Sequence, residues 1–245
     1  MKYIEIQPHD QWYEHVIEDF CDNICPHFGL DVNYKDVQFS GFCSQGDGAS
    51  FTGDFSLCDV SPAELKASLP TEVELHQLVD RLHVFAEDHP TIEGRIIRLS
   101  SYYSHSNTMF IGEFTSDLGY CTVEADDFLP YQDEVLQIFR ELADWLYSRL
   151  SDEYDYQLAD ATASQWSEAV KERKALQVDL DQLQADVAAN PPQSPIQAKI
   201  LTAAISTLEV EIESLTSKID QLSDQFHYWP KDGPLTIEQF YENHF

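Results

Sequence analysis

The sequence predicts an α+β fold, in which an antiparallel sheet packed with helices is followed by a long antiparallel helical hairpin of coiled-coil type. Three observations support this fold class. Segments of alternating apolar residues lie between residues 36 and 124, helical apolar stripes flank them, and a heptad pattern fills the last third of the chain. We therefore expect three parts: an α+β globular domain over residues 1–160, the hairpin over 161–226, and a C-terminal segment, 227–245, that docks on the body.

The globular domain begins with a predicted helix over residues 10–25, where Trp12, Val16 and Phe20 recur at intervals of four. Alternating apolar residues then predict strands, with Val37 and Phe39 in the first and Phe51 and Phe55 in the second. Strands are expected at five places: 36–43, 49–57, 95–103, 108–114 and 120–124.

Two kinds of signal predict the helices of this domain. Ser61 and Thr71 each open a Ser/Thr-x-x-Glu capping box, and Pro62 stands at the first helical position after Ser61. Further along, an apolar stripe from Val135 to Leu150 predicts a helix that lies on the sheet.

The hairpin is predicted from a heptad seam, from Leu201 to Phe226, in which apolar residues alternate at intervals of four and three. The proline-rich turn at 190–195 cannot continue a helix and forces an antiparallel return. The hairpin is expected to serve as a structural or homodimerising arm, or alternatively as an arm that grips a partner. After it, Thr236 and Gln239 predict a capping box for a final short helix.

Charge is the most unusual property of the chain, because 44 Asp and Glu against 14 Lys and Arg give a net charge of −30. Such a charge disfavours direct binding to nucleic acid and to anionic membranes, and it favours basic partners, including nucleic-acid-binding proteins. The alternative is a solvated acidic surface that keeps the protein soluble. The sequence also lacks a signal-peptide core and a run of about 20 apolar residues, so we expect a cytoplasmic protein.

One turn is the candidate binding site: Ser44, Gln45, Gly46, Asp47 and Gly48. Its alternative reading is a structural turn in which Asp47 caps local backbone N–H groups. The tyrosines of two clusters are candidate aromatic contacts, because aromatic area combined with polarity is typical of binding surfaces; they are Tyr102, Tyr103, Tyr154 and Tyr156.

No metal site and no cofactor are expected. The nine histidines are scattered without ligand spacing, and the glycines of the turn match neither a P-loop nor a dinucleotide fingerprint. Five irregularly spaced cysteines, among them Cys21, Cys25 and Cys58, indicate buried reduced thiols.

The segment FSGFCSQGDGASFTG, Phe39 to Gly53, is similar to a widespread group of phage- and plasmid-encoded bacterial proteins, some labelled antitoxin-like. The segment from Leu142 to Tyr156 and the helix with Trp12 and Tyr13 resemble the same group, so the similarity covers roughly residues 10–160. The resemblance implies a phage or mobile-element protein in a bacterial host cell, and it implies no catalytic residues. The long hairpin is a departure from the group.

These observations together favour a non-enzymatic interaction protein that binds and inhibits or modulates a bacterial protein, such as a toxin or a defence factor. In one version it mimics nucleic acid, which eleven acidic residues against two lysines within residues 1–60 make attractive. Two alternatives remain: an enzyme acting on a small molecule or nucleotide through the Ser44–Gly48 turn, and a structural oligomer.

Overall fold

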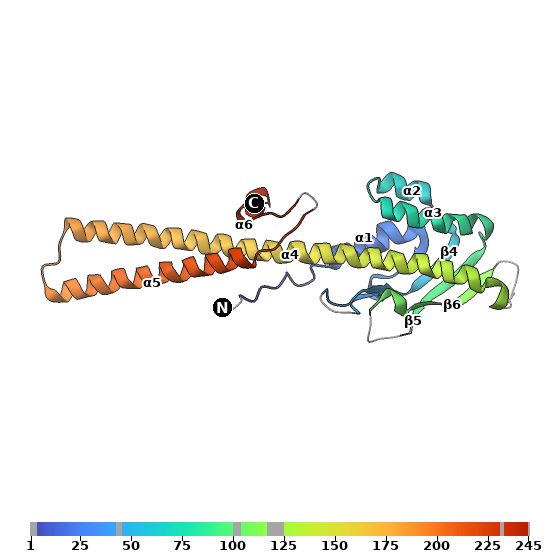
Figure 1. Cartoon of the computed structure of the whole chain (residues 1–245), viewed down its shortest axis with the longest axis horizontal. Coiled ribbons are helices and arrows are strands. Elements are labelled where there is room, and N and C mark those ends of the chain that lie inside the picture. The colour runs from blue at the N-terminus through green and yellow to red at the C-terminus, as the bar shows by residue number, and fades with distance from the viewer. Residues whose placement is uncertain (1–3, 43–45, 100–103, 117–124, 231–232, 245) are drawn as a thin grey trace. The chain divides into compact units, whose positions relative to one another are not determined.

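The computed structural model describes residues 4–42, 46–99, 104–116, 125–230 and 233–244. The chain divides into two compact units, one formed by residues 11–153 and the other by residues 1–10 with 154–245. The predicted fold class is confirmed, because a four-stranded antiparallel sheet with helices is accompanied by two long helices packed as an antiparallel pair (Figure 1).

The main sheet has the strand order β1-β4-β5-β6, and every neighbouring pair is antiparallel. A second, two-stranded sheet pairs β2 with β3. The strand bounds are β1 (Phe28–Asp31), β2 (Val37–Phe39), β3 (Ala49–Phe51), β4 (Gly53–Val60), β5 (Ile92–Arg98) and β6 (Met109–Ser116).

Two strand predictions need correction. The predicted strand 49–57 is two strands in different sheets, since the Thr52 N–H donates to the carbonyl of Asp36 while Gly53 pairs with Ile96 of β5. The edge strand β1 was not predicted, because it is short and contains Gly29. The predicted strand 120–124 lies outside the described residues.

Gly29 is required where it stands in β1. Its φ is +64°, and a Cβ at this position would lie 2.1 Å from the carbonyl oxygen of Ser56 on β4. The register of the two strands shifts at this point, which is the geometry of a β-bulge. The bulge lets β1 approach the backbone of β4 closely.

Helices α1 to α3 and the first part of α4 belong to the unit that contains this sheet, and α5 and α6 belong to the other unit. The first predicted helix is confirmed in outline, as α1 continues into a π-helical turn at Phe20–Ile24 and a 3-10 turn at Cys25–His27. The helix bounds are α1 (Glu14–Asp19), α2 (Pro62–Ser68), α3 (Val73–Asp88), α4 (Ala125–Ala189), α5 (Pro195–Gln225) and α6 (Ile237–His244).

Both capping boxes of this unit were predicted wrongly, although their helices form. The Ser61 side chain makes no cap hydrogen bond, and its hydroxyl instead lies 3.1 Å from Nδ1 of His27. Helix α3 has Glu72 rather than Thr71 as its N-cap residue, and it begins one residue later than the Thr71 box requires. Long-range contacts and backbone geometry thus override the local signal.

The core of this unit lies on one side of the main sheet. Along β4, Phe55 and Leu57 are buried, while Asp54, Ser56 and Cys58 alternate with them and face the other way. The apolar stripe of α4 from Val135 to Leu150 is buried in this core, as predicted, and the rings of Phe55 and Phe139 lie 5.3 Å apart. The opposite face of the sheet therefore presents polar side chains.

The second unit contains the hairpin. Helix α4 ends at Ala189, the turn follows, and Ser194 caps α5 by accepting a hydrogen bond from the Gln197 N–H. The capping box at the last helix is confirmed, since Thr236 and Gln239 exchange hydrogen bonds of 3.0 and 3.3 Å. Helix α6 packs Ile237 and Phe240 against Leu222 and Phe226, and the rings of Phe226 and Phe240 lie 5.5 Å apart.

Candidate functional site

The predicted turn lies in the loop that joins β2 to β3. Ser44 and Gln45 lie outside the described residues, so the structure places only Gly46, Asp47 and Gly48. The loop is closed at its base, where the Ser40 N–H donates to the Gly48 carbonyl at 3.0 Å and the Gly48 N–H donates to Oγ of Ser40 at 3.2 Å. This part of the predicted site has a defined backbone frame.

A close contact also fixes Gly48. A Cβ there would lie 3.2 Å from both the Cα and the ring of His105. The Nδ1 atom of His105 accepts from the Asn107 N–H at 3.1 Å, which places the proton of the neutral ring on Nε2. The prediction of an enzyme that uses the Ser44–Gly48 turn stays a prediction.

An aromatic cluster stands beside this loop, and all of its rings are half-buried. Phe42 stacks on Tyr147 at 5.3 Å and lies 5.9 Å from Trp12. The Tyr147 hydroxyl donates to the Gly41 carbonyl at 2.9 Å. The cluster consists of Trp12, Tyr13, Phe39, Phe42 and Tyr147. Its rings come from the three segments that carry the family resemblance, so these segments meet at one place.

The four predicted contact tyrosines are not brought together by the described structure. Tyr102 and Tyr103 lie outside the described residues. Tyr156 packs within the second unit, where its ring lies 6.1 Å from that of Tyr228 and 5.8 Å from that of Phe240. Tyr154 is half-buried on α4. Their role as partner contacts stays a prediction.

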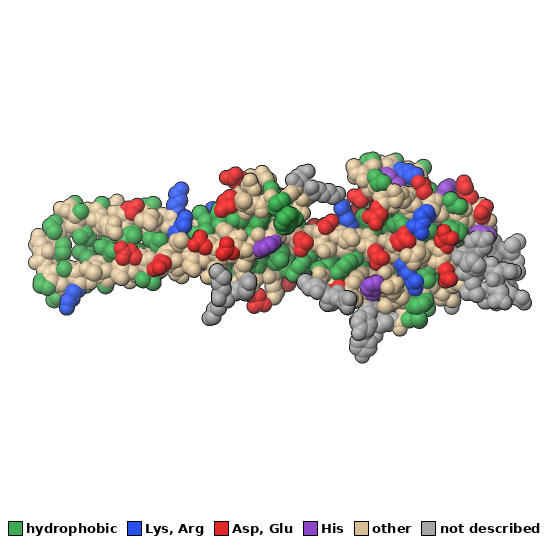
Figure 2. Space-filling view, viewed as in Figure 1, with side chains coloured by type: hydrophobic (Ala, Val, Ile, Leu, Met, Phe, Trp, Pro, Cys, Tyr) green, Lys and Arg blue, Asp and Glu red, His purple; other side chains and the backbone are tan. Residues whose placement is uncertain are grey.

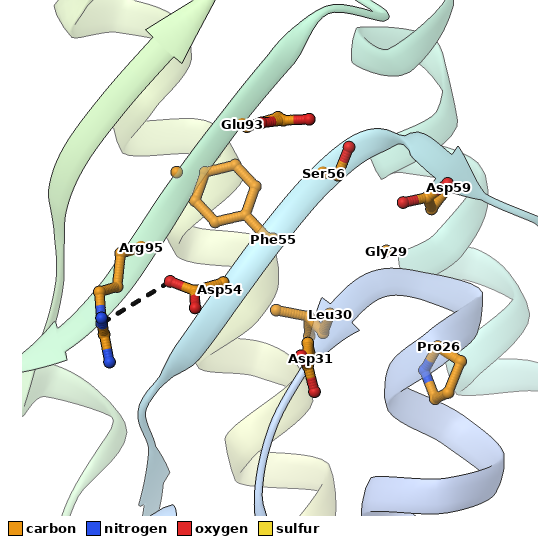
Figure 3. A pocket seen from close by; sticks show the side chains of 11 residues that line it. Pro26, Gly29, Leu30, Asp31, Asp54, Phe55, Ser56, Asp59, Glu93 and Arg95 are labelled. Atoms are coloured by element: carbon orange, nitrogen blue, oxygen red, sulfur yellow. Dashed lines mark ion pairs between the residues drawn. The ribbon is translucent and has the colours of Figure 1, made fainter.

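A groove that the sequence did not reveal lies on the polar face of the main sheet (Figure 3). It has a volume of about 550 Å³ and is lined by residues of β1, β4 and β5 and the segments next to them. We call it the acidic groove, and its charged lining residues are Asp31, Asp54, Asp59, Glu93 and Arg95.

The charges of the acidic groove are unbalanced. Asp54 of β4 stands directly opposite Asp31 of β1 on one side and Arg95 of β5 on the other. The Arg95 Nε atom lies 3.7 Å from Oδ1 of Asp54, and both side chains are largely exposed. Four carboxylates and one guanidinium thus line the groove. Because like charges opposite each other destabilise a sheet, the Asp31–Asp54 pair has a local cost.

Among the described residues, no group of three or more His, Cys, Asp or Glu side chains is arranged to hold a metal ion. None of the helices described is both long and apolar enough to cross a membrane.

Of the three cysteines that the structure describes, Cys25 is buried as expected, Cys21 is half-buried, and Cys58 is exposed. Cys58 is exposed on the polar face of the sheet, next to Asp59 of the acidic groove, whereas Cys25 is buried. Burial raises the pKa of the Cys25 thiol, and burial with the nearby Asp22 and Asp36 raises that of Cys21 to about 11. Cys21 and Cys25 therefore remain protonated at neutral pH and are poor nucleophiles.

The acidic groove was missed because its residues are distant in sequence and come from three strands. Asp31 lies in the strand that was not predicted, and Gly94 lies within β5. The only available signal was the excess of acidic residues in the first quarter of the chain, which does not say where carboxylates converge.

Comparison with known proteins gives one match. Neither the curated proteins nor the solved structures include a match to this chain. A family model described as a domain of unknown function (DUF8835) matches residues 12–160, a range that includes the acidic groove, the β2–β3 loop and the aromatic cluster. The chain belongs to this family.

Proposed function

We propose that this chain is an interaction protein that binds and inhibits or modulates a bacterial protein by receiving a basic segment of that protein in the acidic groove. The observation that carries the proposal is the row of Asp31, Asp54 and Arg95 across three strands, with Asp59 and Glu93 beside it. A Lys- or Arg-rich segment supplies the positive charge that this row lacks.

The resemblance to phage- and plasmid-encoded proteins supports a more specific form of the proposal. In this form the chain is encoded by a phage or mobile element, and its target is a toxin or a defence factor. If the target binds nucleic acid, the carboxylates occupy the basic surface that otherwise binds phosphates. The net charge of −30 then speeds association by long-range attraction.

The test is an affinity pull-down from bacterial lysate with three versions of the tagged chain. The groove variant replaces Asp31, Asp54 and Asp59 with Asn and Glu93 with Gln. The control variant also removes four exposed carboxylates, but at positions on or beside α1 and α3: Glu18→Gln, Asp22→Asn, Glu74→Gln and Asp88→Asn.

We expect the wild-type chain and the control variant to retain the same protein at low salt and the groove variant to lose it. Equal retention by both variants contradicts the proposal, since the binding then depends on total charge or on another surface. Displacement of the retained protein by excess double-stranded DNA supports the mimicry version, and retention in its presence argues for a groove-specific basic segment.

A further inference from the structure

On α5, the apolar seam is buried only near the base of the hairpin. Ile219, Leu222 and Phe226 of this seam are 8%, 0% and 9% exposed, and Leu222 and Phe226 pack in one cluster with Ile237 and Phe240 of α6. Further out, the seam residues of α5 are only half-buried: Leu201, Ile205, Leu208, Ile212 and Leu215. Two helices alone therefore leave the outer seam partly open to solvent.

A second apolar line runs along the outside of α5. Ile196, Ile200 and Val210 are 72%, 63% and 61% exposed, which is unusual for such large apolar residues. Ala203 and Thr207 complete the line and are exposed as well. We call these five residues the outer stripe, and their spacing repeats the four-three interval of the seam. Figure 2 shows hydrophobic side chains on the distal hairpin, at the end opposite the C-terminal helix.

All residues of the outer stripe except Val210 lie in the longest acid-free stretch of the sequence. Residues 187–208 contain no Asp or Glu and a single charged residue, Lys199, although the whole chain carries 44 acidic residues. A basic partner gains no attraction from such a surface. Two copies of this chain, by contrast, repel each other over most of their surface, and this stretch lets them meet without opposing carboxylates.

We propose that the outer stripe binds a second copy of this chain, with the two α5 helices antiparallel and a two-fold axis passing next to Ala203. The stripe is self-complementary about this residue. Ile196 of one copy then faces Val210 of the other, Ile200 faces Thr207, and the two Ala203 residues let the helices approach at the axis. The stripe spans about 21 Å at 1.5 Å per residue.

Charge selects the antiparallel arrangement. Antiparallel pairing brings Lys199 of one copy close to Glu209 of the other, which is an attractive pair. Parallel pairing places the two Lys199 residues opposite each other and the two Glu209 residues opposite each other, and both of these like-charge pairs repel. The contact therefore uses the acid-free stretch at its centre and unlike charges at its flanks.

The test is the mass of the full chain, measured by light scattering and sedimentation over a range of protein concentrations and NaCl concentrations. We expect the mass to rise from 28.1 kDa toward twice that value, and to rise further with salt, which screens the repulsion between copies. Ala203→Glu, which sets two carboxylates against each other at the axis, reduces association at least tenfold. Ala175→Glu, at an exposed position of α4, adds the same charge and leaves association unchanged.

A cross-linking measurement tests the axis itself. In a background with Cys21, Cys43, Cys58 and Cys121 replaced by Ser, copper–phenanthroline oxidation should link Ala203→Cys chains into a covalent dimer and should leave Ala175→Cys chains unlinked. Equal linking of the two variants, or a mass of 28.1 kDa under every condition, overturns the proposal. Binding to phospholipid vesicles by a chain that stays monomeric also overturns it, because the outer stripe then meets lipid.

Discussion

The acidic groove and the outer stripe are surfaces of opposite chemical character in the same chain, one charged and the other apolar. The groove is lined by four carboxylates and one guanidinium on the polar face of a sheet, while the stripe presents Ile196 and Ile200 within 22 residues that lack any acid. In the two proposals, the groove receives unlike charge and the stripe receives an apolar copy of itself. A chain with a net charge of −30 needs both arrangements if it is to bind a basic partner and also associate with itself.

The largest expected effect concerns the apolar seam of α5. Leu222→Ala should lower the free energy of unfolding by about 3 kcal/mol, because a fully buried leucine leaves a cavity. Leu208→Ala, at a half-buried position, should cost about 1 kcal/mol, in proportion to its smaller buried area. Urea unfolding of dilute protein, followed by circular dichroism, compares the two. Equal losses would mean that the outer seam is as well covered as the base.

Added salt should change the affinities of the two surfaces in opposite directions. Raising NaCl from about 50 to 500 mM shortens the Debye length to a few ångströms, so partner binding in the groove should weaken about tenfold or more. Self-association through the stripe should strengthen several-fold over the same range. Titrations of both reactions in one buffer series make the measurement. If salt changed both affinities in the same direction, the proposed difference between an electrostatic groove and an apolar stripe would be contradicted.

A single substitution in the groove should change stability and partner affinity in opposite directions. Asp31→Asn removes the like-charge contact with Asp54 and leaves the Asp54–Arg95 pair in place. The free energy of unfolding should therefore rise by a few tenths of a kcal/mol, while affinity for the basic partner falls about threefold. Asp88→Asn, on α3, is the control and should change neither quantity. A loss of both stability and affinity would show that Asp31 is needed for the fold.

The smallest effect belongs to a carboxylate that already has its partner. Hydrogen bonding from Arg81 lowers the pKa of Glu141, with further help from Gln137. The stabilisation is therefore fully present above the usual glutamate pKa of about 4.3 and is lost as the pH falls through the lower folded-state value. Both side chains are partly exposed, so Glu141→Gln should cost only about 0.5 kcal/mol at pH 7. Unfolding at pH 7 and pH 3 tests this, since the difference should be smaller at the lower pH.

Periodic signals predicted the elements, and isolated residues predicted their details less well. The heptad residues from Leu201 to Phe226 predicted α5 and its return, because a repeated pattern averages over local exceptions. Thr236 and Gln239 form their box, but the same pattern failed at Ser61, whose hydroxyl contacts His27 from 34 residues away. The local sequence contains no record of that contact.

The candidate site was harder to predict than the fold. The acidic groove depends on Asp31, Asp54 and Glu93 coming together through strand order, and strand order is set by pairing across long stretches of chain. The outer stripe was present in the sequence as a second four-three pattern. It became distinct only when the structure showed that Leu201 and Ile205 are half-buried while Ile200 is exposed to solvent.

The bulge at Gly29 has a consequence for the evolution of this family. The backbone of Gly29 lies so close to Ser56 that even one added methyl group has no room, and the positive φ of Gly29 disfavours every other residue. The carboxylates around Gly29 can therefore be substituted during evolution, which would change the partner that the groove is proposed to bind, while position 29 stays glycine. Relatives with different targets are expected to differ at Asp31, Asp59 and Glu93 and to share the glycine that lets their strands meet.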